Sequence, residues 1–212
     1  MINEYLNILR RDYSGKELDV SNTPENPFSL FDQWFEEAVH AQVLEPNAMH
    51  ISTISSEGKP DGRIVLLKEI TPRGFVFYTN YLSKKGKDLT SHPDVNITFF
   101  WIEIMRQVRI KGVAQKTSPE KSDQYFQSRP IDAQCSSAIS PQSAVVEDLS
   151  SFKQSYQRLL DLKQPVARPD HWGGFEIVAE EFEFWQGQAG RFHDRITYQK
   201  HENQWIKKRL AP

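Results

Sequence analysis

The chain has 212 residues, enough for one large domain with a buried core. Its formal net charge of -2 provides no bulk field that would recruit nucleic acid or an anionic membrane, so we expect neither partner. The single cysteine, Cys135, excludes an intrachain disulfide, and the six histidines show no metal-ligand spacing, so we expect no metal site.

The first 45 residues are predicted to be mainly helical. One helix is expected from Ile2 to Arg11, followed by a polar connector that contains proline. Apolar residues recur at helical spacing from Ser29 to Val43, with Ser29 as the N-cap. Residues 1–13 lack the apolar core of a signal peptide, and no stretch is long enough to span a membrane, so a cytoplasmic protein is expected.

Between residues 48 and 115 the hydrophobic period changes to two. Strands are predicted at residues 49–54, 62–68, 75–79, 95–101 and 107–115, with a short helix from Ser83 to Thr90. The turns between these strands are short, and the strands themselves are rich in β-branched and aromatic residues. This pattern favours an antiparallel barrel over alternating βαβ units.

Helices return in residues 118–162. The run Ser118-Pro119-Glu120 is a strong helix start, and the helix should end near Ser128 because Arg129 precedes a proline. Another helix is expected at residues 146–162, and closing strands at 175–178, 181–185, 192–199 and 205–210. The whole chain, residues 1–212, is therefore predicted to be one α+β domain with segments 1–45, 48–115, 118–162 and 172–212.

The closing strands carry a basic pattern. If residues 191–195 are extended, Arg191, His193 and Arg195 share one face, and Trp185 lies a few residues upstream. Cationic donors beside an indole suit a flat, anionic ligand. A solvated basic strand explains the same spacing equally well.

Other basic residues lie at the ends of predicted elements. Lys84 and Lys85 open a short helix, whose N-terminus favours phosphate, although a solvated face is the more common role of a lysine pair. Tyr125 and Arg129 share a helix face and could hold a phosphate, or could simply pack on each other. Arg63 and Lys68 have an odd separation, which places them on opposite faces of one strand.

Longer runs give these residues a context. They are Leu9-Arg10-Arg11-Asp12-Tyr13, Arg63-Ile64-Val65-Leu66-Leu67-Lys68, Phe77-Tyr78-Thr79-Asn80, Arg106-Gln107-Val108, Tyr125-Phe126-Gln127-Ser128-Arg129-Pro130, Pro141-Gln142-Ser143, Trp172-Gly173-Gly174, Glu183-Phe184-Trp185-Gln186-Gly187, Arg191-Phe192-His193-Asp194-Arg195 and Arg209-Leu210-Ala211-Pro212. In this order they resemble the pyridoxine/pyridoxamine 5′-phosphate oxidase family over nearly the whole chain.

The resemblance implies an FMN-binding, antiparallel split β-barrel that forms a homodimer with FMN at the subunit interface. It implies oxidation of pyridoxine 5′-phosphate and pyridoxamine 5′-phosphate to pyridoxal 5′-phosphate, with O2 reduced to H2O2. The implied FMN residues are Arg63, Ile64, Val65, Leu66, Leu67, Lys68, Tyr78, Thr79, Lys84, Lys85, Gln107, Gln142, Ser143, Trp185 and Arg195. The implied substrate residues are Arg10, Arg11, Asp12, Tyr13, Lys68, Tyr125, Arg129, Ala133, Arg191, Phe192 and His193, with Arg191 and His193 as the catalytic pair.

The chain departs from the family pattern at three places. Ala133 replaces a serine that helps bind the substrate phosphate, a loss on the order of 1.5–3 kcal/mol unless Ser136, Ser137 or a water compensates. Lys84 replaces a frequent arginine, and residues 135–139 replace a usual apolar-Gly-Ala-Trp run. Ala133 and the altered loop after it leave open a non-catalytic pyridoxal-phosphate-binding protein of the same fold. The nearest rival enzyme is another flavin-binding split barrel, a flavin reductase-like protein.

Overall fold

The computed structural model describes residues 2, 6, 12–202 and 204–212. The predicted first helix, from Ile2 to Arg11, lies almost entirely outside these residues. The chain divides into two compact units. Unit 1 comprises residues 1–49, 97–111 and 180–212, and unit 2 comprises residues 50–96 and 112–179.

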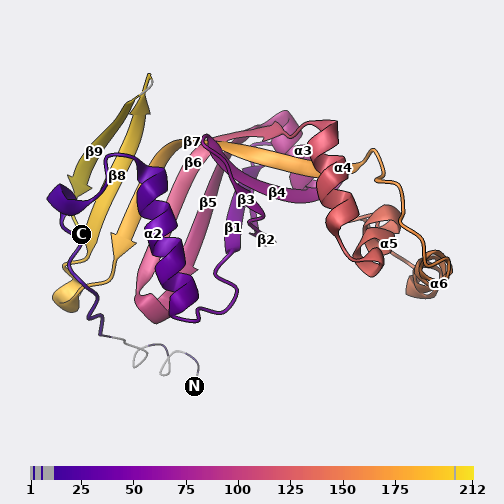
Figure 1. Ribbon diagram of the computed structural model, residues 1–212, viewed down its shortest axis with the longest axis horizontal. Coiled ribbons are helices and arrows are strands. Elements are labelled where there is room, and N and C mark those ends of the chain that lie inside the picture. The colour runs from indigo at the N-terminus through magenta and orange to yellow at the C-terminus, as the bar shows by residue number, and fades with distance from the viewer. Residues whose placement is uncertain (1, 3–5, 7–11, 203) are drawn as a thin grey trace. The chain divides into compact units, whose positions relative to one another are not determined.

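Strands dominate the described part of the chain, with helices grouped before, within and after the strand-rich segments (Figure 1). The helices are α2 (Pro27–His40), α3 (Lys84–Ser91), α4 (Pro119–Ser128), α5 (Ile131–Ile139) and α6 (Leu149–Asp161), and the short 3-10 helices are η1 (Val20–Asn22), η2 (Ile102–Ile104) and η3 (Ala189–Arg191). The strands are β1 (Ala48–Ile54), β2 (Pro60–Leu66), β3 (Glu69–Ile70), β4 (Gly74–Asn80), β5 (Asp94–Trp101), β6 (Arg106–Lys116), β7 (Trp172–Gln186), β8 (Asp194–His201) and β9 (Gln204–Leu210).

The strands form one sheet with the order β2-β1-β5-β6-β7-β4-β3, and β8 pairs with both β7 and β9. The pairs β3–β4, β4–β7, β7–β8 and β8–β9 are all antiparallel. β7 is a single strand of 15 residues, so the prediction of two separate strands at 175–178 and 181–185 was wrong. The polar pair Glu180-Glu181 interrupts the apolar pattern but not the strand, because β4 pairs with β7 up to Val178 and β8 pairs with it from Glu181. The predicted mainly β class with flanking helices is confirmed.

The core of unit 1 is aromatic. Helix α2 buries its apolar stripe against strands of its own unit, with the ring of Phe31 5.0 Å from that of Phe99 and Trp34 5.2 Å from Phe184. Burial of such rings gives about 1.5–3 kcal/mol each relative to exposure. Two polar atoms of this core are satisfied by backbone, since the Trp101 indole donates to the Pro46 carbonyl and the Tyr198 hydroxyl donates to the Pro24 carbonyl.

The start of α2 differs from the prediction. Asn26, not Ser29, is the N-cap, and its side-chain oxygen accepts the N–H of Phe28 at 3.0 Å. Pro27 then occupies the first helical position, where its missing N–H is not needed. Ser29 is exposed in the first turn. The helix therefore begins two residues before the expected range.

Unit 2 packs its core around β4 and the first half of β7. Phe75, Phe77, Phe175 and Ile177 are fully or almost fully buried, and the Phe77 and Phe175 rings stack at 5.9 Å. The register pairs Phe77 with Phe175 directly across the two strands. This rigid pair of strands supports the side chains at its ends, where the candidate site lies.

Two helix starts in unit 2 follow the prediction. Ser118 caps α4 through the N–H of Lys121, and α4 ends at Ser128 as expected. Ser83 caps α3 through the N–H of Gly86, so α3 begins at Lys84. In contrast, α5 was not predicted, because its first residue directly follows Arg129-Pro130 and its composition is mixed.

No helix among the described residues is long and apolar enough to cross a membrane.

Candidate functional site

The predicted binding residues of unit 2 gather around a cavity of about 400 Å³, which we call the smaller cavity. Its walls come from the end of β2, the end of β4, the start of α3, and the α4–α5 region. The lining residues are Arg63, Ile64, Val65, Leu66, Lys68, Tyr78, Thr79, Lys85, Tyr125, Arg129, Ser137, Gln142 and Trp172. Predicted FMN residues and predicted phosphate residues therefore share one cavity.

Arg63 and Lys68 both line this cavity, although their odd separation predicted opposite faces. The alternation holds only within a regular strand, and β2 ends at Leu66. The chain bends through Leu67 and Lys68 before β3 begins, which returns the lysine to the same side. Leu67 is instead buried.

Arg63 is held in place by carboxylates. Its guanidinium contacts Asp61 at 2.6 Å and Asp88 at 3.8 Å, and it donates to the Thr53 hydroxyl at 2.6 Å. Lys84 joins the same two carboxylates, at 2.8 Å from Asp61 and 3.2 Å from Asp88. Its hydrogen bond to Asp61 raises the pKa of the Lys84 ammonium. Both cations are thus largely neutralised by neighbours.

Lys85 has a different environment. Its ammonium donates to two neutral oxygens, the Thr79 hydroxyl at 3.4 Å and the Gln142 side-chain oxygen at 3.3 Å. Burial lowers the pKa of Lys85 and the neighbouring Arg63 charge lowers it further, while the Asp61 charge has a smaller opposing effect. Among the described residues no carboxylate pairs with it. A partly buried cation without a counter-ion is the usual feature of an anion site.

An aromatic stack forms the opposite wall. The rings of Tyr78 and Tyr125 stack at 3.8 Å, and Trp172 lies nearly parallel to both. Burial raises the pKa of Tyr78 to about 12, with the Glu69 charge as a smaller cause, so its phenol stays neutral and can donate. Arg129 lies over the Trp172 ring at 4.8 Å and donates to the Ser137 hydroxyl at 2.9 Å.

Arg129 is the C-cap residue of α4, so its backbone leaves the helix and its side chain reaches the cavity. Burial lowers the pKa of this arginine, while the nearby Tyr125 and Asp132 oppose the shift. The guanidinium remains charged under all ordinary conditions. Tyr125, Arg129 and Lys68 therefore present three donors to the cavity, which matches the predicted phosphate set.

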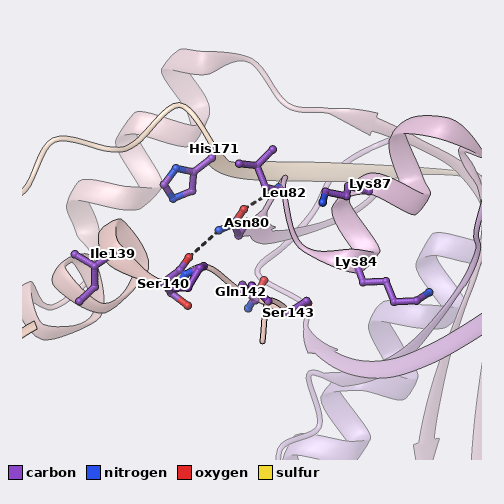
Figure 2. A pocket seen from close by; sticks show the side chains of 11 residues that line it. Asn80, Leu82, Lys84, Lys87, Ile139, Ser140, Gln142, Ser143 and His171 are labelled. Atoms are coloured by element: carbon purple, nitrogen blue, oxygen red, sulfur yellow. Dashed lines mark hydrogen bonds between the residues drawn. The ribbon is translucent and has the colours of Figure 1, made fainter. Parts of the chain in front are cut away.

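A larger cavity of about 620 Å³ lies in the same unit (Figure 2). Lys84, Lys87 and the loop that contains Gln142 and Ser143 line it, together with His171. The Asn80 amide donates to the Ser140 carbonyl at 3.0 Å, which fixes this loop. The predicted FMN residues of unit 2 are thus divided, with Lys84 and Ser143 at the larger cavity and Gln142 lining both cavities.

In unit 1 three rings form what we call the indole–imidazole cluster, made of Tyr13, Trp185 and His193. The Tyr13 ring meets Trp185 at 5.5 Å and His193 at 5.4 Å, both edge-on. Trp185 and His193 lie 4.7 Å apart. Tyr13 as a predicted substrate residue, Trp185 as a predicted FMN residue and His193 as a predicted catalytic residue are therefore in mutual contact.

The tautomer of His193 follows from its hydrogen bond. The backbone N–H of Gln188 donates to Nδ1 of His193 at 3.1 Å. An imidazole nitrogen that accepts a hydrogen bond carries no proton, so the neutral ring carries its proton on Nε2. His193 therefore offers an N–H donor at Nε2. For Nε2 to act as a base instead, the neutral ring would have to carry its proton on Nδ1.

Arg191 does not belong to the closing strand. It ends η3 with φ of 64°, in the left-handed region, and β8 begins only at Asp194. The predicted strand-like alternation of residues 191–195 was therefore wrong for residues 191–193, which precede β8. Phe192, in this stretch, is 76% exposed. A left-handed arginine costs roughly 1–2 kcal/mol and such strain clusters at functional sites. The Arg191 side chain is exposed.

Arg195 is fixed by a buried carboxylate. Its Nε and NH2 groups donate to Glu183 at 3.0 and 2.9 Å, and its NH1 group donates to the Ala211 carbonyl at 2.9 Å. Glu183 is only 8% exposed and also accepts from Arg109 at 3.1 Å. The antiparallel register places Trp185 directly beside Arg195. The sequence pattern assigned no role to Glu183, which appeared only as a member of one of the matching runs.

Residues 13–18 run along the loop between β7 and β8. The Gly15 N–H donates to the Gly187 carbonyl at 3.1 Å, and the Leu18 N–H donates to the buried Asp194 carboxylate at 3.0 Å. Position 15 must be glycine, because a Cβ atom there would lie 2.4 Å from the Gly187 oxygen. These contacts hold Tyr13 against Trp185 and His193.

The remaining predicted residues have varied surroundings. Arg10 and Arg11 lie outside the described residues, and Asp12 is exposed. Gln107 is half-buried near the start of β6. Ala133 lies on α5 and does not line the smaller cavity, whereas Ser137 does. Among the described residues no three histidine, cysteine or acidic side chains gather as a metal site.

Solved structures with the same arrangement define the class of fold. PhzG from Burkholderia lata 383, in complex with tetrahydrophenazine-1-carboxylic acid, superposes with a TM-score of 0.90 at 28% identity, covering 94% of this chain and 100% of that chain. A pyridoxamine 5′-phosphate oxidase-related, FMN-binding protein from Nostoc punctiforme has a TM-score of 0.70 at 12% identity, covering 86% and 97%. The predicted antiparallel split β-barrel is confirmed.

Sequence comparison narrows this class. A family model described as "Pyridoxamine 5'-phosphate oxidase" matches residues 35–163, and one described as "Pyridoxine 5'-phosphate oxidase C-terminal dimerisation region" matches residues 172–212. The pyridoxine/pyridoxamine 5′-phosphate oxidase of Haemophilus influenzae is 47% identical over 209 residues, which cover 98% of this chain and 99% of that protein. The chain belongs to the pyridoxamine 5′-phosphate oxidase family.

Proposed function

We propose that this protein is an FMN-dependent oxidase that converts pyridoxine 5′-phosphate and pyridoxamine 5′-phosphate to pyridoxal 5′-phosphate and reduces O2 to H2O2. The observation that carries the proposal is the smaller cavity, where cations and neutral donors suited to two phosphates line one space. The near-full-length similarity to relatives named for this reaction supports it. A cytoplasmic location is part of the same proposal.

The donor set of the smaller cavity fits FMN. Lys85 supplies positive charge for its phosphate and Arg63 adds guanidinium N–H donors, while Thr79 and Gln142 supply neutral polar atoms. We assign FMN binding to the set predicted above, with Gln107, Trp185 and Arg195 contributed by unit 1. Bound FMN would accept the hydride from the substrate carbon next to the pyridine ring and be reoxidised by O2.

The protein's own residues would bind and orient the substrate. Lys68, Tyr125 and Arg129 hold its phosphate, and Arg191 and His193 position the ring and the reacting alcohol or amine. The Nε2 proton of His193 is available as a donor to that group, because Nδ1 is already occupied. Arg195 would bind the flavin and, through the part of its charge that Glu183 leaves uncompensated, would favour electron acceptance by the cofactor.

We further propose a homodimer with FMN at the subunit interface. The match of residues 172–212 to a dimerisation region supports the dimer. The FMN residues fall into two groups, one in each unit, and an interface site would draw one group from each copy. This arrangement also makes dimerisation a requirement for activity.

The test is oxygen consumption by the purified protein with each phosphorylated vitamer, without NAD(P)H. We expect a yellow protein with a flavin spectrum that produces one H2O2 for each pyridoxal 5′-phosphate formed. A colourless protein that binds pyridoxal 5′-phosphate without turnover would instead be a carrier or sensor. Activity that requires NAD(P)H would identify a flavin reductase. Oxidation of tetrahydrophenazine-1-carboxylic acid, the compound bound to PhzG, with no vitamer turnover would contradict the proposal.

A further inference from the structure

Ser137 lies at the point where the smaller cavity meets helix α5. Its hydroxyl oxygen accepts from NH1 of Arg129 at 2.9 Å, and its side chain lines the same cavity as Lys68 and Tyr125. We propose that Ser137 is a substrate-phosphate ligand, which donates its hydroxyl proton to a phosphate oxygen of the vitamin B6 substrate. This inference rests on the proposed function and adds a residue to its phosphate site.

The chemistry of the hydroxyl supports this role. A serine hydroxyl has one proton to donate and two lone pairs that accept. Arg129 occupies a lone pair, and among the described residues the Ser137 hydroxyl donates to no protein acceptor. The donor therefore remains available on the side of the cavity. Contact with a guanidinium polarises the O–H bond, which strengthens its donation to an anion.

The position of Ser137 is well fixed. Gln134, 2% exposed, donates to the Arg129 carbonyl at 2.8 Å and accepts the Val166 N–H at 3.0 Å. This amide joins the end of α4, the start of α5 and the segment before β7. Arg129 is oriented independently by the Trp172 ring. Arginine and serine are therefore held next to each other before any ligand binds, so little entropy is lost on binding.

Helical spacing distinguishes Ser137 from its neighbours. Ala133 and Ser137 are four residues apart and share one face of α5, so Ser137 places a hydroxyl one turn beyond the position where Ala133 has none. Ser136 points elsewhere on the helix, is exposed and does not line the cavity. Of the two serines considered as compensation for Ala133, the geometry therefore selects Ser137.

The first experiment compares Ser137→Ala with Ser136→Ala in the holoenzyme. We expect Ser137→Ala to raise the KM for pyridoxamine 5′-phosphate about tenfold or more, the loss of one hydrogen bond to a charged group. The kcat and the FMN content should stay within about twofold, as should all three quantities in Ser136→Ala. An unchanged KM in Ser137→Ala would overturn the proposal.

A double-mutant cycle separates direct contact from an effect through Arg129. If Ser137 binds phosphate itself, Ser137→Ala should still weaken binding about tenfold in an Arg129→Ala background. Loss of the effect in that background would mean that Ser137 only positions the arginine, and would overturn the proposal. Equilibrium dialysis with pyridoxal 5′-phosphate measures this binding even if the protein oxidises neither vitamer, so failure of the proposed function is distinguishable.

Discussion

Glu183 is a buried carboxylate between two arginines. Its single charge is shared by Arg195 and Arg109, which come from different strands of unit 1. If this buried negative charge is removed, both guanidinium groups lose the carboxylate that balances part of their positive charge. Because the arginine side chains are partly exposed, water offsets part of that loss.

We predict that Glu183→Gln lowers the free energy of unfolding by about 2 kcal/mol, measured by chemical denaturation. Glutamine keeps the shape and one acceptor oxygen but removes the charge, so the change reports electrostatics rather than packing. Glu183→Gln should also weaken FMN retention if Arg195 contacts the cofactor.

The matched control is Glu181→Gln, two residues earlier on the same face of β7. Glu181 pairs with Lys111 at 2.8 Å, and this pair is considerably more exposed. Its loss should cost less than about 0.5 kcal/mol, as for most surface ion pairs. Equal effects of the two substitutions would show that burial of Glu183 has no energetic consequence.

Single residues of the site were predictable where their chemistry is distinctive. Lys85, Tyr125 and Arg129 were phosphate candidates from their helix positions, and the resemblance added Lys68. The structure places all four at one cavity. The choice between Ser136 and Ser137 needed the helix, because only a turn-by-turn position shows which hydroxyl faces inward. The tautomer of His193 likewise depends on a backbone N–H that no sequence pattern identifies.

At the level of elements, helix caps are a sensitive test of the observed boundaries. We predict that Asn26→Ala lowers the free energy of unfolding by about 1 kcal/mol, because the Phe28 N–H loses its acceptor. Ser29→Ala, at the position that the sequence favoured as the cap, should change stability by less than about 0.5 kcal/mol, since alanine is a good helix former. Thermal or urea unfolding would measure both, and a larger loss in Ser29→Ala would contradict the observed cap.

Elements with local signals were predicted closely, and those set by distant partners were not. The starts of α3 and α4 depend on a serine three residues before a free N–H, which is visible in the sequence. The length of β7 depends on pairing with β4 and β8 along its two halves. The delayed start of β8 reflects left-handed backbone at Gly190 and Arg191, where the side chain of arginine gives no indication of a turn.

For the whole molecule, the dimer proposal makes a prediction that single variants cannot test. Arg129→Ala damages the smaller cavity, and Arg191→Leu damages the residues next to the indole–imidazole cluster. Each homodimer should have severely reduced turnover. A purified heterodimer of the two variants would have two interface sites, each built from both copies. One site would contain both substitutions and the other would contain neither, which restores about half of the normal activity.

A site built within one copy would behave differently, because each chain of the heterodimer would still carry one lesion in its own site. Activity near that of the separate variants would therefore contradict the interface proposal. Size-exclusion chromatography with light scattering would establish beforehand that the heterodimer is the species assayed. The two-unit division of the chain was not predicted from sequence, because β5, β6 and β7 each pass through both units.

The bond between Arg195 and the carbonyl of Ala211 has a practical consequence. An arginine assigned to the cofactor is tied to the backbone of Ala211, directly after β9. Removal of residues 211 and 212 would therefore act on the guanidinium itself. A variant shortened at Leu210 should keep its yellow colour less firmly than the 212-residue chain.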